Sequence, residues 1–266
     1  MYTMIFKTIK KEVDSIVHFK YLLALLVRRN FMSRYRRSVL GVLWPLLNPL
    51  LMMLVITMVF SHMFSREIEN YPVYLLSGQL IFNYFSESTK QAMRSVTDHA
   101  GIIKKVYVPK CIFVLARVLS SLVNLLFSFA AFMLIFIVMR MPFQWAMLLI
   151  PIPVIYTLVF ALGVGLILSS LAVFFRDITY IYDIFILLLM YMTPLFYPAS
   201  LLSGTAAVIM NFNPIYHFVS YFRSLALSGI VPGLWQNLVC AGFSLTAFCI
   251  GVYVFIKQQP KYILYL

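Results

Sequence analysis

Stretches of about 20 consecutive apolar residues recur along this chain, and each is long enough to cross the roughly 30 Å hydrocarbon layer of a membrane. The first reads VLWPLLNPLLMMLVITMVFS, residues 42–61. Only 11% of the 266 residues are charged, against about 25% in soluble domains. Because a backbone in lipid must satisfy its own hydrogen bonds, the sequence predicts an all-α polytopic membrane protein.

We predict six transmembrane helices. They lie at residues 42–61, 72–90, 111–139, 145–174, 181–197 and 234–256. If both ends of the chain lie on one side, 18 of the 21 Lys and Arg residues share that side. Cytoplasmic loops carry such an excess of basic residues, so we expect both termini in the cytoplasm. The same placement accounts for the net charge of +13 without a nucleic-acid partner.

Two segments fit neither a span nor a solvated loop. Residues 19–37 combine a short apolar run with a basic cluster, which is typical of an N-terminal interfacial helix lying on anionic headgroups. Residues 198–233 are apolar but are broken at Asn213-Pro214, and irregular backbone at membrane depth needs cover from protein or a water-lined cavity. We expect short re-entrant helices in the outer leaflet there; a compact outer cap is the alternative.

The sequence offers little for catalysis. It has no G-x-x-x-x-G-K-[ST] phosphate loop and no G-x-S-x-G elbow. The four histidines are scattered, and the three cysteines lie at or inside apolar runs without metal-ligand spacing. We therefore expect neither a catalytic residue nor a metal site, and no cofactor bound by this chain.

Polar residues form one-sided stripes within two of the spans. The second span carries, at helical spacing, Gln79, Asn83, Ser86 and Lys90. The third carries Arg117, Ser121, Asn124 and Ser128 in the same way. Polar groups facing lipid are expensive, so each stripe faces another helix or a water-filled route. Both interpretations stay open for the second span, and helix–helix hydrogen bonding is favoured for the third.

Aromatic residues are abundant in and near the fifth span. Tyr180, Tyr182 and Tyr197 suit interfacial anchoring. Phe185 and Tyr191 lie deeper, where their flat rings are able to pack against sugar faces. Anchoring is the more common role of such residues.

Four motifs together carry a family resemblance. They are RRNFMSRYRRSVLGVLWPLLNPLL before and into the first span, GIIKKVYVPKCIFVLARV between spans two and three, AVFFRDITYI after the fourth, and NFNPIYHFVSYFRSLAL before the sixth. In this order, and in a chain this short, they resemble the permease subunits of ABC exporters that move polysaccharides, such as O-antigen, teichoic acid and rhamnose-glucan exporters. The resemblance covers nearly the whole chain.

The resemblance implies partners. Two permease copies form the pathway in that family, and two separate ATP-binding cassette subunits bind beneath them, so ATP and Mg²⁺ would be bound by those partners. Residues 95–107 would be the cytoplasmic coupling helix. Its candidate residues are Asp98, Ile102, Ile103, Lys104, Lys105, Val106 and Tyr107, with Arg176 and Asp177 in the next cytoplasmic connection. A plain basic loop and a plain helix-end charge pair are the alternatives.

The resemblance also implies a substrate route bordered by spans one, two and five. This raises a pathway role for Gln79, Asn83, Phe85 and Tyr191, with Phe185 as a further candidate. We expect residues 1–266 to form a single permease domain in the bacterial cytoplasmic membrane that exports a lipid-linked polysaccharide, in contact with membrane lipids. An exporter of a drug or small lipid, or a non-transport membrane protein of a glycan pathway, is the alternative.

Overall fold

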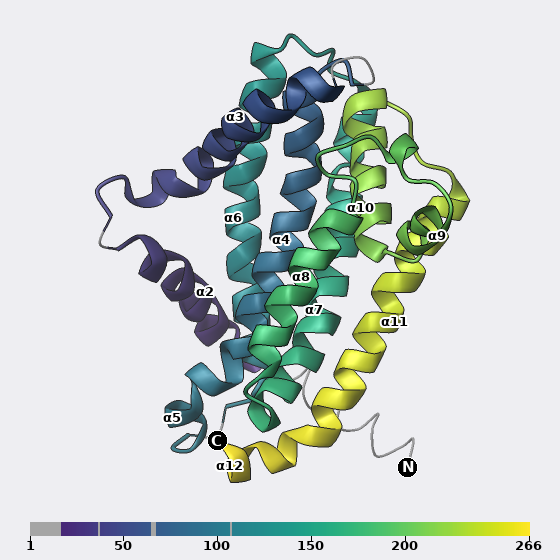
Figure 1. Ribbon diagram of the computed structural model, residues 1–266. Helices are drawn as coiled ribbons and strands as arrows, with labels where there is room; N and C mark the ends of the chain where they lie inside the picture. The colour runs from purple at the N-terminus through teal and green to yellow at the C-terminus, as the bar shows by residue number, and fades with distance from the viewer. Residues whose placement is uncertain (1–16, 37, 65–67, 107) are drawn as a thin grey trace.

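The structure, a computed structural model, describes residues 17–36, 38–64, 68–106 and 108–266, and every regular element in those ranges is a helix. The α-helices are α2 (Lys20–Tyr35), α3 (Trp44–Phe64), α4 (Tyr71–Asp98), α5 (Ala100–Ile103), α6 (Cys111–Val138), α7 (Pro151–Phe174), α8 (Ile178–Met192), α9 (Thr205–Asn211), α10 (Pro214–Arg223), α11 (Leu234–Gln258) and α12 (Tyr262–Tyr265). Figure 1 shows α4, α6, α7, α8 and α11 running side by side, with α5 and α12 at one end. We call this the α5 end.

Four helical stretches are long and apolar enough to cross a membrane. They are Gly41–Ser61, Cys111–Val138, Trp145–Phe174 and Leu234–Tyr265. The other two predicted spans correspond to α4 and α8. Helix α4 is long, with 28 residues, but its second half carries charged side chains. Helix α8 is apolar but has only 15 residues. The all-helical prediction is confirmed over the described residues.

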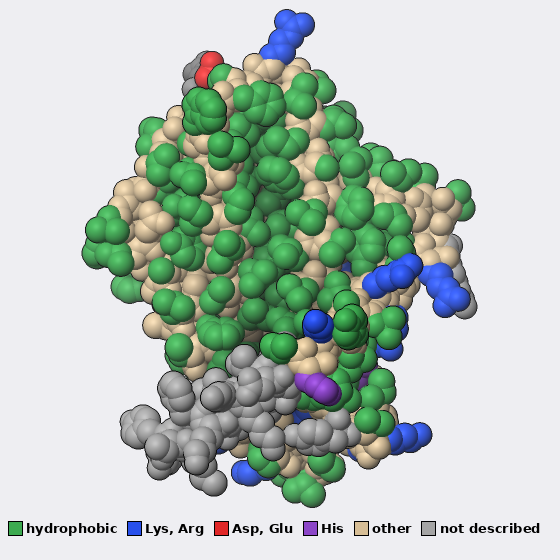
Figure 2. Space-filling view, turned by 180° about the vertical axis from the view of Figure 1, so that it is seen from behind, with side chains coloured by type: hydrophobic (Ala, Val, Ile, Leu, Met, Phe, Trp, Pro, Cys, Tyr) green, Lys and Arg blue, Asp and Glu red, His purple; other side chains and the backbone are tan. Residues whose placement is uncertain are grey.

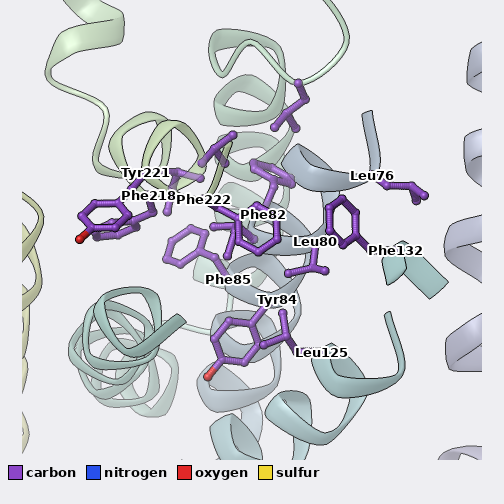
Figure 3. Close-up of a cluster of buried hydrophobic side chains, with 14 of the residues drawn as sticks. Leu76, Leu80, Phe82, Tyr84, Phe85, Leu125, Phe132, Phe218, Tyr221 and Phe222 are labelled. Atoms are coloured by element: carbon purple, nitrogen blue, oxygen red, sulfur yellow. The ribbon is translucent and has the colours of Figure 1, made fainter. Parts of the chain in front are cut away.

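Helix α4 is the centre of the bundle. It packs against α6 and α7 along most of its length, and its apolar side chains are buried on several faces. Figure 3 shows Phe82 and Phe85 of α4 beside Phe132 of α6 and Phe222 of α10 in one buried cluster. Because α4 is surrounded by protein, it tolerates polar residues that a lipid-facing helix would not.

Two glycines let α7 and α11 approach closely. A Cβ atom on Gly163 of α7 would lie 2.4 Å from backbone atoms of Ala247 in α11. A Cβ atom on Gly251 would lie 2.3 Å from the carbonyl oxygen of Gly163. Small residues at helix crossings of membrane proteins allow this backbone contact, so the two glycines fix the place of α11 against the bundle.

A second buried cluster lies at the α5 end. Ile103 of α5 and Leu26 of α2 belong to it together with Tyr262 of α12, which is fully buried. The Tyr262 hydroxyl lies 2.6 Å from Ser170 Oγ of α7. Lys110 Nζ donates to the carbonyl of Gln259 at 2.9 Å. These contacts tie both the start of α6 and the residues after α11 to the same end of the molecule.

Helix α8 ends earlier than the predicted span at 181–197. It stops at Met192 because Pro194 lacks an N–H and disfavours a helical conformation at the residue before it; Thr193 is extended. Arg223 of α10 occupies the break, and its Nη1 donates to the Pro194 carbonyl at 2.7 Å. Its guanidinium also lies 3.5 Å over the ring of Tyr74 in α4. The arginine thus satisfies backbone oxygen atoms that the break exposes.

The segment predicted as re-entrant, 198–233, folds into short helices. They are the 3-10 helix Ala199–Leu201, α9, α10 and the π-helical turn Ser224–Ser228. The Asn213 side chain accepts a hydrogen bond from the Ile215 backbone N–H at 3.0 Å, and so caps α10. The Asn213-Pro214 break therefore begins α10 rather than leaving an irregular loop.

Candidate functional site

A groove of about 810 Å³ lies between α3, α4, α6 and α8 and contains several of the predicted residues. Its lining residues are Tyr35, Trp44, Pro45, Asn48, Pro49, Met52, Ile56, Phe60, Gln79, Phe82, Asn83, Ser86, Glu87, Lys90, Asn124, Ser128, Met190, Tyr191, Leu195 and Phe196. The α3 side is mostly apolar and aromatic, whereas α4 supplies a polar stripe. The groove is therefore amphipathic across its width.

The polar stripe predicted for the second span faces this groove. Gln79, Asn83, Ser86 and Lys90 all line it. Asn83 is exposed, while Gln79 is buried and its Oε1 atom has no hydrogen-bond partner among the described residues. A buried amide oxygen without a partner is costly, so Gln79 has acceptor capacity left for a group that enters the groove.

The polar residues along one face of α6 differ in their contacts: some line the groove and others bond to α4. Asn124 and Ser128 line the groove, whereas Ser121 Oγ accepts a hydrogen bond from Gln91 Nε2 of α4 at 3.0 Å. Arg117 Nη2 lies 2.8 Å from Asp98 Oδ2 at the end of α4. Helix–helix bonding, the favoured interpretation for this stripe, accounts for Arg117 and Ser121, and Asn124 also donates to Glu87 of α4.

Two ion pairs flank the groove at the α5 end. Arg34 of α2 pairs with Glu87 of α4, and Lys90 Nζ lies 2.7 Å from Asp183 Oδ1 of α8. Glu87 Oε1 also accepts from Asn124 Nδ2 at 2.6 Å and from Gln91 Nε2 at 2.8 Å. Glu87 therefore joins α2, α4 and α6 at one point.

The three aromatic candidates lie in different places. Tyr191 is exposed and lines the groove. Phe85 is only 2% exposed and packs on the other side of α4, with its ring centroid 5.5 Å from that of Phe160. Phe185 is exposed on α8, stacked on Tyr182 at 6.0 Å, and does not line the groove. The expectation that Phe85 borders the groove is thus corrected: the residue belongs to the core.

The predicted coupling helix 95–107 is two elements rather than one. Residues up to Asp98 continue α4, and after His99 the chain forms the single turn α5. Ile102 and Val106 are 40% and 57% exposed, and Lys104 and Lys105 are exposed beside them. Tyr107 lies outside the described residues.

Ile103 differs from its neighbours. Its side chain is 7% exposed and packs in the cluster shared with α2 and α6. The expectation that it offers an apolar contact to a partner is corrected, because it faces the bundle. It holds α5 in place, and the outward apolar surface is supplied by Ile102 and Val106.

Arg176 and Asp177 form the exposed connection between α7 and α8. Neither takes part in an ion pair with another residue of the described ranges. The neighbouring Phe175 side chain is 66% exposed. The connection thus presents two opposite charges and an aromatic ring to the surroundings at the α5 end.

His99 joins the junction of α4 and α5 to α2. Arg29 Nη2 lies 2.6 Å from His99 Nε2, and His99 Nδ1 lies 2.7 Å from the carbonyl oxygen of Ser95. Burial and the nearby Arg117 and Arg29 lower the pKa of His99, although the Ser95 contact acts in the opposite direction. The side chain is therefore held as neutral imidazole.

The family model described as ABC-2 type transporter matches residues 21–227. The chain belongs to this family. The resemblance indicated by the four sequence motifs is thereby confirmed, and the ABC-2 chain is embedded in a membrane as part of a transporter.

Relatives of this ABC-2 chain extend over nearly its whole length. This chain is 28% identical over 244 residues to the O-antigen export system permease protein RfbA of Klebsiella pneumoniae. The match covers 91% of this chain and 93% of that protein. It is 26% identical over 252 residues to RfbA of Myxococcus xanthus, covering 94% and 97%. The polysialic acid transport protein KpsM of Escherichia coli is 22% identical over 238 residues, covering 87% and 91%.

Sequence reasoning missed the partners of the charged groove residues in this ABC-2 chain. In the sequence, Glu87 lies within the second predicted span, Arg34 in the basic cluster of residues 19–37, and Asp183 near the start of the fifth predicted span. A signal was present: a carboxylate such as Glu87 inside a span needs a partner. The basic helix immediately before the first span was the nearest source of one. No group of three or more His, Cys, Asp or Glu side chains in the described ranges is arranged to hold a metal.

Proposed function

We propose that this chain is the membrane-spanning subunit of an ATP-driven exporter that moves a lipid-linked polysaccharide across the bacterial cytoplasmic membrane. The observation that carries the proposal is the near full-length similarity to O-antigen export permeases from two different organisms. A second polysaccharide transport protein, KpsM, matches over almost the same extent.

Six membrane crossings are part of the proposal. To the four apolar helices we add α4 and α8. Helix α4 has 28 residues and is therefore about 42 Å long, enough to cross the bilayer and project beyond it. Its polar side chains turn toward α6 and the groove. Residues 193–197, which follow α8 in a non-helical conformation, would complete its crossing, and α9 and α10 would dip into the outer leaflet.

The α5 end is the proposed cytoplasmic end. Figure 2 shows Lys and Arg side chains gathered mainly over the lower part of the molecule, beneath a broad apolar surface. Cytoplasmic segments carry such a basic excess. Both chain termini would then face the cytoplasm, and α2 would lie along the inner surface of the membrane with its cations toward anionic headgroups.

A second copy of this chain completes the proposed pathway. The groove is open on one side, and the α3 and α8 surfaces beside it expose apolar residues such as Val55, Met58, Ile184 and Leu188. Two grooves facing each other would enclose a route lined by both copies. The exposed Phe185 would then lie at or near the contact between them.

Two separate ATP-binding subunits would supply the energy. Ile102, Val106 and the lysines beside them would form the contact that receives their movement, aided by Arg176 and Asp177. ATP and Mg²⁺ would be bound by those subunits and not by this chain. Because α5 follows α4 directly, movement of the contact would reach the groove through one helix.

The groove suits a saccharide. The amides of Gln79 and Asn83 are able to donate and accept hydrogen bonds with sugar hydroxyl groups, and Tyr191 offers an aromatic face. An exporter of a drug or small lipid is the principal alternative, and a membrane protein of a glycan pathway without transport activity is the second.

The deciding experiment is depletion of this protein from cells, followed by mass spectrometry of extracted membrane lipids. We expect a lipid-linked glycan to accumulate and to remain protected from glycosidases added outside. Normal surface polysaccharide without accumulation would favour the drug or small-lipid exporter. Failure of any ATP-binding subunit to co-purify would favour the non-transport alternative.

A further inference from the structure

We propose that a pocket at the end of the molecule opposite α5 binds a neutral sugar unit of the exported glycan. This pocket is separate from the groove. The inference rests on the proposed function, in which this end of the molecule faces the outside of the cell. It adds a second saccharide site, which would hold the glycan after it has emerged from the groove.

The pocket has a volume of about 440 Å³ and lies where three segments meet. They are the start of α4, the residues that follow α8, and α10 with the π-helical turn after it. Figure 1 shows α10 in the half of the molecule away from α5. None of the residues that line this pocket lines the groove. The two cavities are therefore distinct, and this one has the size of a small-molecule site.

The pocket carries polar side chains with unused hydrogen-bonding capacity. Within the described ranges, no hydrogen bond or ion pair involves the side chains of Glu69, Asn70, Tyr216, Ser220 or Ser228. These groups include carboxylate, amide and hydroxyl oxygen atoms as acceptors, and amide and hydroxyl hydrogen atoms as donors. A sugar hydroxyl group both donates and accepts, so a saccharide is able to satisfy both kinds of group at once.

Two tyrosine rings give the pocket its aromatic surface. The Tyr74 hydroxyl donates to the Tyr197 carbonyl at 2.9 Å, and the Arg223 guanidinium covers the Tyr74 ring at 3.5 Å, so this ring is held in place. Tyr216 of α10 is half-buried, and its hydroxyl makes no hydrogen bond in the described part of the chain. A ring with a polar tip suits a sugar, which has an apolar face of C–H groups and a rim of hydroxyl groups.

Arg223 argues against a phosphate or another simple anion as the ligand. A phosphate is held by the fork of the terminal guanidinium nitrogen atoms. In Arg223 these atoms already donate to the carbonyl oxygens of Pro194, Tyr74 and Leu195, at 2.7, 3.2 and 3.3 Å. The exposed carboxylate of Glu69 lines the same pocket and would repel an anion. A neutral sugar meets neither obstacle.

The pocket and the groove share one wall, the segment 194–198. Pro194 and Pro198 line the pocket, whereas Leu195 and Phe196 line the groove. Arg223 fixes this segment through its carbonyl oxygens. A sugar in the pocket would hold the segment further in place, so that occupancy of the outer site would affect the groove without any direct contact between the two ligands.

The test measures sugar binding without transport. The complex of this chain with its ATP-binding subunits, in phosphatidylcholine nanodiscs, is studied by saturation-transfer difference NMR. The probes are the methyl glycosides of glucose, mannose, galactose, rhamnose and N-acetylglucosamine, titrated into the millimolar range. We expect at least one of them to bind with a millimolar dissociation constant. If none binds, the pocket is not a saccharide site and the proposal is overturned.

Substitutions then place the bound sugar. Glu69→Gln, which removes a charged acceptor, and Tyr216→Ala should each weaken binding about tenfold. Tyr216→Phe keeps the ring and loses only the hydroxyl, so we expect a loss of about threefold. Glu69 and Ser228 are exposed; Glu69→Gln and Ser228→Ala therefore keep the test valid if Tyr216→Ala fails to fold. Unchanged affinity in Glu69→Gln and Tyr216→Phe would overturn the site.

Matched controls make similar changes elsewhere. Tyr191→Ala alters the groove, and Asp177→Asn removes an exposed carboxylate at the α5 end. Both should leave the affinity for the glycoside unchanged. If Tyr191→Ala abolishes binding while Glu69→Gln does not, the sugar binds only in the groove and the outer site is overturned. Displacement of the glycoside by inorganic phosphate would overturn it as well, because the ligand would then be an anion.

The source of the sugar is tested by competition. Fragments of the surface polysaccharide, released from the same cells by mild acid, should displace the glycoside. Failure to displace it would overturn the link with the exported glycan. Glycoside binding without accumulation of a lipid-linked glycan on depletion would remove the export function and leave a saccharide site. Accumulation without glycoside binding would remove only the outer site.

Discussion

Arg29 of α2 donates a hydrogen bond to His99 at the junction of α4 and α5, with 2.6 Å between Nη2 and Nε2. Since a guanidinium has no acceptor, Nε2 carries no proton, and the Nδ1–H donates to the Ser95 carbonyl at 2.7 Å. The His99 ring also stacks on Phe113 at 4.5 Å. The neutral imidazole is thus a structural joint between α2 and the junction of α4 and α5.

This joint predicts a pH dependence of stability. Burial, the largest cause, and the neighbouring Arg117 and Arg29 lower the pKa of His99 below its ordinary value of 6.5, while the Ser95 carbonyl and Asp98 act in the opposite direction. Below pH 6.5 the unfolded chain binds a proton that the folded chain resists. The contribution of His99 is therefore present above pH 6.5 and is lost as the pH falls through the folded-state pKa.

We expect the thermal unfolding midpoint of the detergent-solubilised protein to fall between pH 7 and pH 5. His99→Gln should remove part of that slope, because its amide oxygen accepts from Arg29 without titrating. His18→Gln, at an exposed histidine, is the control and should keep the wild-type slope. Parallel curves for wild type and His99→Gln would contradict the prediction.

The crossing of α7 and α11 predicts a steric effect. Gly163→Ala places a methyl group 2.4 Å from the backbone of Ala247, and backbone atoms move only with their whole helix. We expect a loss of ~1–3 kcal/mol, the usual cost of overpacking, seen as a lower unfolding midpoint. Gly242→Ala in α11 meets nothing within 4 Å and should be neutral or stabilising. Equal effects of the two variants would refute the close crossing.

The two isoleucines of α5 predict different outcomes. Ile102→Asp alters an exposed side chain, so stability should change by no more than ~0.5 kcal/mol while co-purification of the ATP-binding subunit decreases. Ile103→Asp should cost more than the ~2–5 kcal/mol of a large-to-small core change, because it also buries a charge. Measuring unfolding midpoint and co-purification together separates the two. Unchanged co-purification with Ile102→Asp would remove this residue from the contact.

Substitutions of the aromatic candidates Tyr191 and Phe85 should differ in their effects on export and stability. Tyr191→Ala should reduce export several-fold without altering the unfolding midpoint, since one aromatic contact is worth ~0.5–1.5 kcal/mol. Phe85→Ala should instead lower stability by ~3–5 kcal/mol, as for other buried phenylalanines. Export is measured as surface polysaccharide at equal protein abundance. A Phe85→Ala variant with full stability and impaired export would return this residue to the pathway.

Hydropathy and residue spacing were sufficient to predict the long apolar helices and the polar stripe of α4. The third predicted span, 111–139, ends one residue beyond α6, and the spacing of Gln79, Asn83, Ser86 and Lys90 was enough to place them on one face. The same spacing argues against Phe85. It follows Asn83 by two residues, about 200° around a helix, and so points to the opposite side.

Features that depend on contacts between residues distant in the sequence could not be predicted from hydropathy and residue spacing. Hydropathy did not indicate that Pro194 would end α8, because the residues from 189 to 197 are apolar apart from Thr193. The turn at His99 changes the direction of the side chains after it, so the sequence alone did not distinguish the inward Ile103 from the outward Ile102. The ion pair Arg34–Glu87 joins residues 53 positions apart in the sequence, and Lys90–Asp183 joins residues 93 positions apart.

The uninterrupted course of α4 has one further consequence. The only proline of this helix, Pro72, lies in the first turn, and Arg223 holds the half of α4 nearer Tyr71 against the break after α8. A stiff rod held near one end acts as a lever, so a small displacement at the α5 end becomes a swing about the point where Arg223 lies. Opening and closing of the groove would then need no hinge within α4, only a change of its tilt.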